Sequence, residues 1–556
     1  MLAFAIGGFR PGLVLAALVI VTVACGDGGE PPSPSPESTA SPARSPLPDP
    51  TLKPSPEAPA VRPTTSLDLA TDQPLLTLGG ANAEDFRIEA SSLAAGDFNG
   101  DGVDDLLIGA PSGDGPDESR EEGGEAYLVF GSRGLGGGID LVPEQVGLIV
   151  YGALPGDELG FAVAGGDLNG DGIDDVVVSA PASNGLPNIR TDLGEVYIIF
   201  GSPSLGGVVD TANSEQDVTV IAAEGFARLG TSLAIGDVNG DGTDDLVAGA
   251  PFAGREEGTP PGGPRTTLGE VYVVFGSPSL PPGISVARSE QDFTMSGSRE
   301  LDTFGGRVVT ADVNGDGIAD IIASARGDDG PDDSRADVGA GYVFFGGDGL
   351  SGKRGVEEAS VAIFAADEED FLGDAVASGD IDGDGIADIV LASRFGDGPA
   401  NRRNLAGEVY VILGSPSLPD VIDLASDEPG AVVYGVDGAD RMAASLATAD
   451  LDGDGADELI MGVPFGGGLE DARERSGEVY VLAGRRLLGS VDLRYDVAGV
   501  AFIFGAAAED RLGTAVLAAD PNGDGTTEIV VLAHLAAGQE ERAGAVYAVP
   551  VPASSD

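Results

Sequence analysis

The sequence predicts an all-β protein built from seven similar units, and three observations support this fold class. One acidic motif recurs seven times, at intervals of 68 to 75 residues. Each copy is followed by a short apolar run, a polar glycine-rich loop and a strand-like segment that contains tyrosine. None of these segments has the apolar period of a helix. Four short strands per unit, separated by turns, predict a seven-bladed β-propeller with four-stranded antiparallel blades.

The motif and its flanks assign the strands of each blade. The first copy reads Asp97-Phe98-Asn99-Gly100-Asp101-Gly102-Val103-Asp104-Asp105, and the later copies begin at Asp167, Asp237, Asp312, Asp380, Asp450 and Asp520. Strand A precedes the motif, strand B follows it, strand C carries the tyrosine, and strand D comes last. The chain ends after a strand C, whereas a spare D-like strand at residues 75–78 precedes the first strand A. We therefore expect the N-terminal strand to complete the last blade and remove the open sheet edges.

The composition fits this class and disfavours several functions. The chain has 556 residues, of which 42% are hydrophobic and 88 are glycine. Lys and Arg number 29 against 92 Asp and Glu, which gives a formal net charge of −63. Such a surface repels nucleic acid and anionic membrane. The single cysteine excludes an internal disulfide, and the single histidine disfavours His-ligated zinc and Ser-His-Asp catalysis.

The N-terminus predicts export and lipid anchoring. A nearly unbroken apolar run at residues 12–24 is too short to span a bilayer, which takes ~20 residues, but has the length of a signal-peptide core. The only cysteine, Cys25, follows at once, and Val21-Thr22-Val23-Ala24-Cys25-Gly26 resembles the lipobox of bacterial lipoproteins. We expect residues 1–25 to be a lipoprotein signal peptide with a lipidated Cys25. An ordinary signal peptide with a chance cysteine is the alternative.

The next segment, residues 26–66, is rich in proline and serine and lacks apolar periodicity. This composition predicts a disordered tether. We expect residues 67–556 to form the propeller, held by its lipid anchor outside the cytoplasm, in a bacterial cell envelope.

The repeat resembles the FG-GAP repeat of integrin alpha chains over roughly residues 67–556. The first element appears as Phe304-Gly305 and, with leucine, as Leu159-Gly160, Leu229-Gly230, Leu372-Gly373 and Leu512-Gly513. The second element appears as Gly109-Ala110-Pro111 and Gly249-Ala250-Pro251, with variants at Ser179 and Gly462. Arg326, Arg394 and His534 replace its proline in blades 4, 5 and 7. This resemblance implies the propeller fold and calcium-binding loops, and it names no ligand.

The motif itself has the spacing of a calcium loop. Calcium takes six to eight oxygen ligands, and the motif offers side-chain oxygens at positions 1, 3, 5 and 9 and a carbonyl at position 7. An EF-hand would need Glu at position 12 and flanking helices, but position 12 is Ile108 in the first copy. The predicted ligands of up to seven calcium ions are Asp97, Asn99, Asp101, Val103, Asp105; Asp167, Asn169, Asp171, Ile173, Asp175; Asp237, Asn239, Asp241, Thr243, Asp245; Asp312, Asn314, Asp316, Ile318, Asp320; Asp380, Asp382, Asp384, Ile386, Asp388; Asp450, Asp452, Asp454, Ala456, Glu458; and Asp520, Asn522, Asp524, Thr526, Glu528.

We interpret these ions as structural, because each loop joins strands A and B and a bound ion stabilises the turn. An acidic, solvated turn without metal is the alternative. The B–C loops lie at the other end of the strands and vary widely, as at residues 112–125, 252–270 and 395–408. Variable loops on a rigid scaffold often carry recognition. Arg326 and Arg394, with Arg402 and Arg403, form either a small basic site there or ordinary surface charge, and His534 is a tolerated proline replacement.

These features favour a non-enzymatic adhesion or ligand-binding module that engages a surface protein or glycan through its B–C and D–A loops. Two alternatives stay open: a calcium-dependent enzyme acting on polysaccharide, and a structural scaffold of the envelope. Phospholipases that carry FG-GAP repeats have a separate catalytic domain, and we expect none in this chain. We predict no catalytic residues.

Overall fold

The structure is a computed structural model, and it describes residues 66–80, 86, 92–185, 192–223, 225–254, 267–331, 334–468, 472–487, 489–496, 498–537 and 542–551. The predicted signal peptide, Cys25 and nearly all of the predicted tether lie outside these residues. Among the residues described, no helix is long and apolar enough to cross a membrane.

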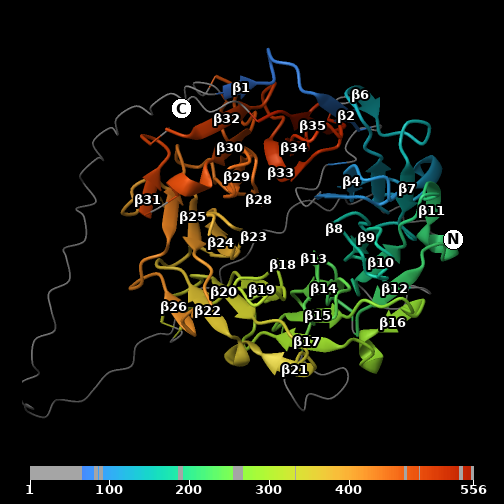
Figure 1. Cartoon of the computed structure of the whole chain (residues 1–556), viewed down its shortest axis with the longest axis horizontal. Helices are drawn as coiled ribbons and strands as arrows, with labels where there is room; N and C mark the ends of the chain where they lie inside the picture. The colour runs from blue at the N-terminus through green and yellow to red at the C-terminus, as the bar shows by residue number, and fades with distance from the viewer. Residues whose placement is uncertain are drawn as a thin grey trace, which may run out of the picture. The chain divides into compact units, whose positions relative to one another are not determined.

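Seven sheets surround a central axis, which confirms the predicted seven-bladed β-propeller (Figure 1). Strands A to D of each blade are antiparallel neighbours, and A strands lie nearest the axis. The A strands are β3 (Leu93–Gly96), β8 (Val163–Gly166), β13 (Ser232–Gly236), β18 (Val308–Ala311), β23 (Ala375–Gly379), β28 (Ser445–Ala449) and β33 (Leu512–Ala519). The B strands are β4 (Asp105–Ala110), β9 (Asp175–Ala180), β14 (Asp245–Ala250), β19 (Asp320–Ala325), β24 (Asp388–Ser393), β29 (Glu458–Val463) and β34 (Glu528–Ala533).

The C and D strands form the outer half of each blade. The C strands are β5 (Glu125–Val129), β10 (Glu195–Ile199), β15 (Glu270–Val274), β20 (Ala340–Phe344), β25 (Glu408–Ile412), β30 (Glu478–Leu482) and β35 (Ala545–Val549). The D strands are β7 (Leu148–Tyr151), β12 (Val218–Ile221), β17 (Phe293–Ser296), β22 (Val361–Phe364), β27 (Ala431–Tyr434), β32 (Val500–Phe504) and, from the N-terminal end, β2 (Leu76–Gly79). Short 3-10 helices follow at η1 (Pro116–Glu118), η2 (Thr211–Asn213), η3 (Val286–Arg288), η4 (Val356–Glu358) and η6 (Gly484–Arg486).

A fifth strand that the sequence did not predict extends every sheet. It comes from the C–D connection of the next blade and pairs in parallel with strand D. These strands are β11 (Gly207–Asp210), β16 (Gly283–Ser285), β21 (Gly352–Gly355), β26 (Val421–Asp423), β31 (Gly489–Asp492), β1 (Ser66–Asp68) and β6 (Gly137–Asp140), and they lie at the rim (Figure 1). They are short and largely exposed, so they lack the apolar alternation by which a strand is recognised.

The N-terminal segment closes the ring, as predicted. Strand β2 pairs antiparallel with β35, with Leu76 opposite Ala548, and so supplies the missing D strand of blade 7. Strand β1 pairs in parallel with β32 and completes the sheet of blade 6. Arg473, in the B–C loop of blade 6, donates to the Asp68 carboxylate at 2.7 Å and ties β1 in place. One continuous N-terminal stretch therefore contributes to two blades.

The core lies between blades. All six residues of β4 are buried, because neighbouring sheets cover both of its faces. Leu106 and Ile108 pack toward blade 7, whereas Leu107 packs toward blade 2. The buried apolar residues of the described chain form seven such clusters, each shared by two consecutive blades. Blades that stack face to face explain why an antiparallel strand reads as a continuous apolar run.

Close contact between blades explains the two glycine elements of the repeat. A Cβ placed on Gly109 would lie 1.9 Å from the carbonyl oxygen of Gly160 in the next blade. Gly160 itself has a φ of +90°, which side-chain-bearing residues rarely adopt. The paired glycines thus allow the start of one blade to lie against the B strand of the previous blade.

Candidate metal centres

The nine-residue motifs form the A–B turns, all at the same end of the strands. In blade 5, the Asp380 carboxylate accepts the backbone N–H groups of Asp384 and Gly385 at 2.9 and 2.8 Å. Asp384 in turn accepts the N–H of Ile386 at 2.9 Å. The first carboxylate accepts the corresponding pair of N–H groups in all seven loops. A φ of +91° at Gly385 permits the sharp turn.

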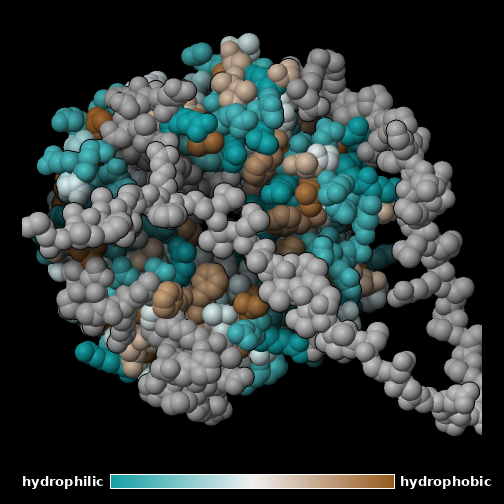
Figure 2. Space-filling view, turned by 180° about the vertical axis from the view of Figure 1, so that it is seen from behind, coloured by the Kyte–Doolittle hydropathy of each residue, from teal (hydrophilic) through white to brown (hydrophobic). Residues whose placement is uncertain are grey.

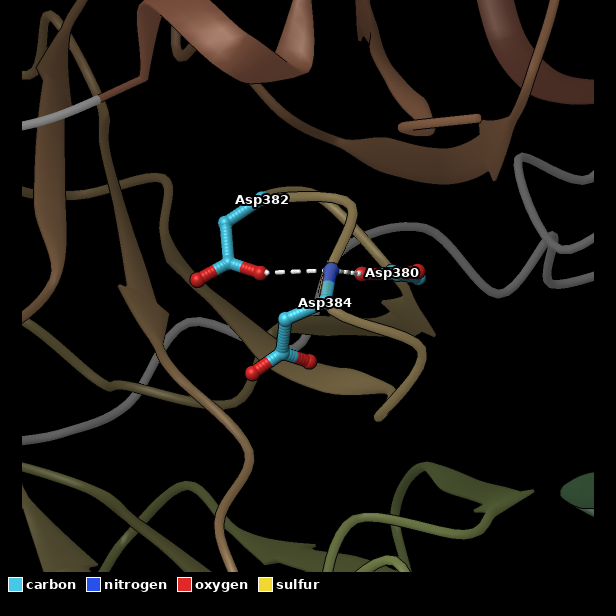
Figure 3. Close-up of side chains that lie close together, drawn as sticks. All are labelled: Asp380, Asp382 and Asp384. Atoms are coloured by element: carbon cyan, nitrogen blue, oxygen red, sulfur yellow. Dashed lines mark hydrogen bonds between the residues drawn. The ribbon is translucent and has the colours of Figure 1, made fainter. Parts of the chain in front are cut away.

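This turn brings the carboxylates at positions 1, 3 and 5 together. In blade 5, Asp380, Asp382 and Asp384 each place one carboxylate oxygen within 4.8 Å of the other two (Figure 3). Asp450, Asp452 and Asp454 do the same in blade 6. The other five loops have Asn at position 3, so they combine two carboxylates with an amide oxygen. All seven loops offer the hard oxygen donors that calcium prefers.

The carboxylate at position 9 lies beneath the turn. Asp388 is 1% exposed and accepts the N–H groups of Ile381 and Gly414 at 3.0 and 2.8 Å. Burial, with the nearby Asp382 carboxylate adding to it, raises the pKa of Asp388 to about 6. In blade 1, burial together with Asp101 and Asp97 raises the pKa of Asp105 to about 7. Hydrogen bonds from the backbone therefore hold the position 9 carboxylate in place without an ion.

The loop of blade 7 differs because it carries a proline at position 2. Position 2 is Pro521, which has no N–H to donate to position 9. Glu528 at position 9 accepts only from the Asn522 side chain, at 2.8 Å, and its buried Oε2 has no hydrogen-bond partner in the described chain. Burial raises the pKa of Glu528 to about 7, with Asp524 and Asp520 adding to the effect.

Position 8 carries a role that the sequence analysis missed. Asp174 in blade 2 accepts the N–H of Asp97, position 1 of the preceding loop, at 2.9 Å. The same bond joins three further pairs of neighbouring loops, including blades 7 and 1 through Asp104 and Asp520. An acid at position 8 in four of the seven copies was the signal available in the sequence. Four of the seven pairs of neighbouring A–B loops are thus hydrogen-bonded to one another through this side chain.

On the opposite face, the structure separates the predicted basic residues. Arg326 and Arg394 share the buried carboxylate of Asp374, at 3.4 and 3.2 Å. Arg403 is only 4% exposed and pairs with Asp492 of β31 at 2.8 Å, so its inclusion in a basic site was wrong. Arg402 is exposed. His534 is buried against the Thr514 hydroxyl at 2.6 Å, and desolvation followed by the Arg511 charge lowers its pKa to about 4.

Comparison with known proteins identifies the repeat. The FG-GAP repeat family matches residues 90–129, 159–199, 229–274, 372–412 and 442–482, which cover strands A to C of blades 1, 2, 3, 5 and 6. Phosphatidylinositol-glycan-specific phospholipase D of Homo sapiens is 33% identical over 38% of this chain and 24% of its own length. The rat protein of the same name is 26% identical over 70% of this chain and 45% of its own length. Integrin alpha pat-2 of Caenorhabditis elegans is 27% identical over 46% of this chain and 19% of its own length.

These relatives correct one expectation. The repeats and the scarcity of histidine predicted a non-enzymatic module, but phospholipase D enzymes from five species match the chain at 26 to 38% identity. A non-enzymatic role therefore does not follow from the repeat. The chain spans less than half of the length of each of these relatives. Together with the seven sheets, the matches establish a seven-bladed β-propeller in which blades 1, 2, 3, 5 and 6 match the FG-GAP repeat.

Proposed function

We propose that the chain is a calcium-stabilised binding module that works outside the cytoplasm. Its A–B loops hold calcium, and its B–C and D–A loops engage a surface protein or glycan. The observation that carries the proposal is the convergence of three carboxylates in the loops of blades 5 and 6, repeated with Asn at position 3 in the other five.

The chemistry of the donors fits calcium. Each loop offers carboxylate oxygens, joined in five of the seven by an Asn amide oxygen, and no sulfur or imidazole, so a hard divalent cation is favoured over zinc. Asp380, Asp382 and Asp384 would hold the ion in blade 5, with Asp388 and the Ile386 carbonyl as the remaining predicted ligands. A bound ion supplies positive charge that offsets the repulsion between these carboxylates. Because the acid at position 8 links four pairs of neighbouring loops, an ion bound in one of these loops also stabilises its neighbour.

The opposite face supports the binding role. Its B–C loops differ in sequence from blade to blade, while the strands that present them are buried and regular. An open ring face with variable loops suits recognition of a macromolecule. The net charge of −63 disfavours partners that spread negative charge over the whole face, such as nucleic acid or an anionic membrane, but not an anion bound at a local cluster of arginines.

Lipidation of Cys25 would place the module at a bacterial membrane surface, with residues 26–66 as its tether. The lipobox-like segment before Cys25 supports this part of the proposal. Cells expressing the full chain and a Cys25→Ser variant would be labelled with a radioactive fatty acid. The proposal expects label on the first protein only, and equal labelling of both would contradict it.

A second candidate is an activity like that named for the phospholipase D relatives, supported by their 26 to 38% identity. Purified chain would be incubated with a glycosylphosphatidylinositol-anchored protein, with an authentic phospholipase D as positive control. Release of the anchored protein would establish the enzymatic role. No release under conditions in which the control acts would leave binding as the role.

The binding role is tested with Pro59–Asp556, the compact unit that contains the closed ring. This unit is screened against glycans and matrix proteins in calcium and in chelator. The proposal expects a ligand that is retained in calcium and lost in chelator. Absence of any ligand from a calcium-saturated, folded sample would contradict it.

A further inference from the structure

Arginine and phenylalanine side chains alternate along one part of the face that carries the B–C and D–A loops, which we call the loop face. They belong to blades 4 to 7. We call this set the Arg–Phe arc, and its members are Arg326, Phe371, Arg394, Phe395, Arg441, Phe465 and Arg511. Each residue lies just before a strand A or just after a strand B, so all of them project from the ends of the buried inner strands. Figure 2 shows one face of the ring, which is mainly hydrophilic with small apolar patches.

The rings hold the guanidinium groups in place. The guanidinium carbon of Arg326 lies 5.2 Å from the centre of the Phe371 ring and 5.9 Å from that of Phe395. Arg441 lies 5.1 Å from the Phe395 ring and 5.5 Å from that of Phe465. The rings of Phe371 and Phe395 are themselves in edge contact at 5.5 Å. Cation–π contacts of this kind fix the planes of the guanidinium groups.

The arc gathers positive charge that its surroundings do not fully neutralise. Arg394 and Arg511 complete it, at 5.2 Å from the Phe395 ring and 5.0 Å from the Phe465 ring. Three guanidinium groups thus surround Phe395, and like charges this close repel one another. Asp374 pairs with Arg326 and Arg394, but Arg441 forms no ion pair with the residues that the structure describes. With 92 acidic residues in the chain, this concentration of arginine indicates an anion as the missing partner.

The surface beside the arc carries hydrogen-bond acceptors. A hollow of about 460 Å³ next to Phe465 is lined by Arg441, Arg475, Asp440 and Glu474. Carboxylates accept hydrogen bonds from hydroxyl groups, whereas guanidinium groups donate to acid groups. A ligand that offers both acid groups and hydroxyl groups fits this mixture better than a bare polyanion.

An acidic protein segment fits less well. Protein interfaces bury an apolar centre, and their strongest contacts are large side chains in dry pockets. The phenyl rings of the arc are covered by guanidinium groups. The large apolar side chains that are exposed in the described chain, such as Leu301 and Val421, lie outside the arc.

We propose that the Arg–Phe arc binds an acidic polysaccharide. Its carboxylate or sulfate groups lie on the guanidinium groups, and its hydroxyl groups lie against Asp440 and Glu474. This inference rests on the proposed binding role of the loop face and names the class of ligand. Arginine suits the task because its planar fork matches carboxylate and sulfate geometry.

The test measures binding of Pro59–Asp556, in calcium, to oligogalacturonate, dextran sulfate and neutral dextran by titration calorimetry. We expect binding to at least one acidic glycan and none to dextran, and the two acidic probes distinguish carboxylate from sulfate recognition. The double variant R441Q/R511Q should lose at least tenfold in affinity. The control is R288Q, which removes a charge from a side chain that is 77% exposed on the C–D connection of blade 3 and should leave affinity unchanged.

Melting curves of each variant are recorded, and the single variant R394Q is a second probe if the double variant melts early. Equal affinity of R441Q/R511Q and R288Q for the acidic glycan would overturn the inference, as would failure of both acidic probes to bind. Binding of a neutral glycan or matrix protein that ignores the arc variants would overturn the inference but keep the binding role. No ligand of any kind would contradict both.

Discussion

The two faces of the ring differ in how far their loops repeat from blade to blade. On the face of the A–B loops, the seven loops share one length and one hydrogen-bond pattern, in which the first carboxylate accepts two backbone N–H groups. On the loop face, the B–C loops differ in sequence, and an arginine anchor recurs in blades 1, 4, 5 and 6. Arg120, Arg335, Arg403 and Arg473 each bind an aspartate on the fifth strand of their own sheet. Repetition fixes the first face, whereas the second is free to vary between its anchors.

The difference teaches where this fold can diversify. An A–B loop that changed length would lose its turn and, in the four pairs linked through position 8, its contact with the next loop, as the hydrogen bond from the Asp97 N–H to Asp174 shows. The B–C loops that carry the arginine anchor differ in sequence around it. The Arg–Phe arc lies on this freer face, which is where a ligand site can evolve without disturbing the ring.

The largest effect on stability is expected from a substitution at position 9, beneath one A–B loop. Asp388→Ala leaves the buried N–H groups of Ile381 and Gly414 without a partner, so we expect a loss of about 2–4 kcal/mol in the free energy of unfolding. Arg441→Ala on the opposite face should cost less than about 1 kcal/mol. Chemical denaturation in chelator measures both. Equal losses would contradict the contrast between the two faces.

Next in size is the response to pH. Burial, with Glu408 and Asp367 adding to it, raises the pKa of Asp370 to about 8 from 3.8, so the native state holds a proton that the unfolded chain releases. The stability from this group is complete below about pH 4 and is lost as the pH rises through 8. We expect a loss on the order of 2 kcal/mol between pH 6 and 7.5, also in calcium, because Asp370 is not a predicted metal ligand.

Asp370→Asn should flatten this pH dependence. Denaturant unfolding of both proteins at several pH values measures the difference in slope. An unchanged slope in the variant would show that Asp370 does not titrate as its burial indicates.

A smaller effect is expected at the anchor that closes the ring. Arg473→Ala removes the half-buried pair with Asp68 and should cost about 1–2 kcal/mol. Arg475→Ala, two residues away, removes an exposed pair with Glu509 and should cost less than about 0.5 kcal/mol. Thermal melting compares the two variants. A greater loss for Arg475→Ala would refute the anchoring role.

The smallest expected effect is a difference in calcium affinity between loops with Asp and loops with Asn at position 3. Asp382→Asn gives blade 5 the Asn found at position 3 of five other loops, and it removes one charge from the ion's surroundings. We expect about a threefold to tenfold weaker affinity at that site, since ligand charge tunes calcium binding. Calorimetric titration follows the change, with Asn169→Asp as the reverse substitution. A tighter site in Asp382→Asn would contradict the assignment of position 3.

The sequence predicted the number of blades, the order of strands A to D and the closing role of residues 75–78, because the repeat period and apolar runs encode them. It did not predict the fifth strands, since β6 and β11 pair through their backbones and bury little. Only part of the Arg–Phe arc could be predicted from the sequence. Arg326 and Arg394 follow strand B in an aligned repeat, whereas Arg441 and Arg511 lie on other connections and join them only when the ring forms. Arg403 was misplaced because sequence does not tell an anchoring arginine from an exposed one.

The central claim is that the A–B loops are calcium sites that hold the ring together. Differential scanning calorimetry of Pro59–Asp556 in millimolar calcium and in chelator, with calcium stoichiometry measured on the same sample, tests it most directly. The account predicts several calcium ions per chain, up to seven, and a melting temperature clearly higher in calcium than in chelator. Identical melting in the two conditions, with no calcium retained, would contradict it.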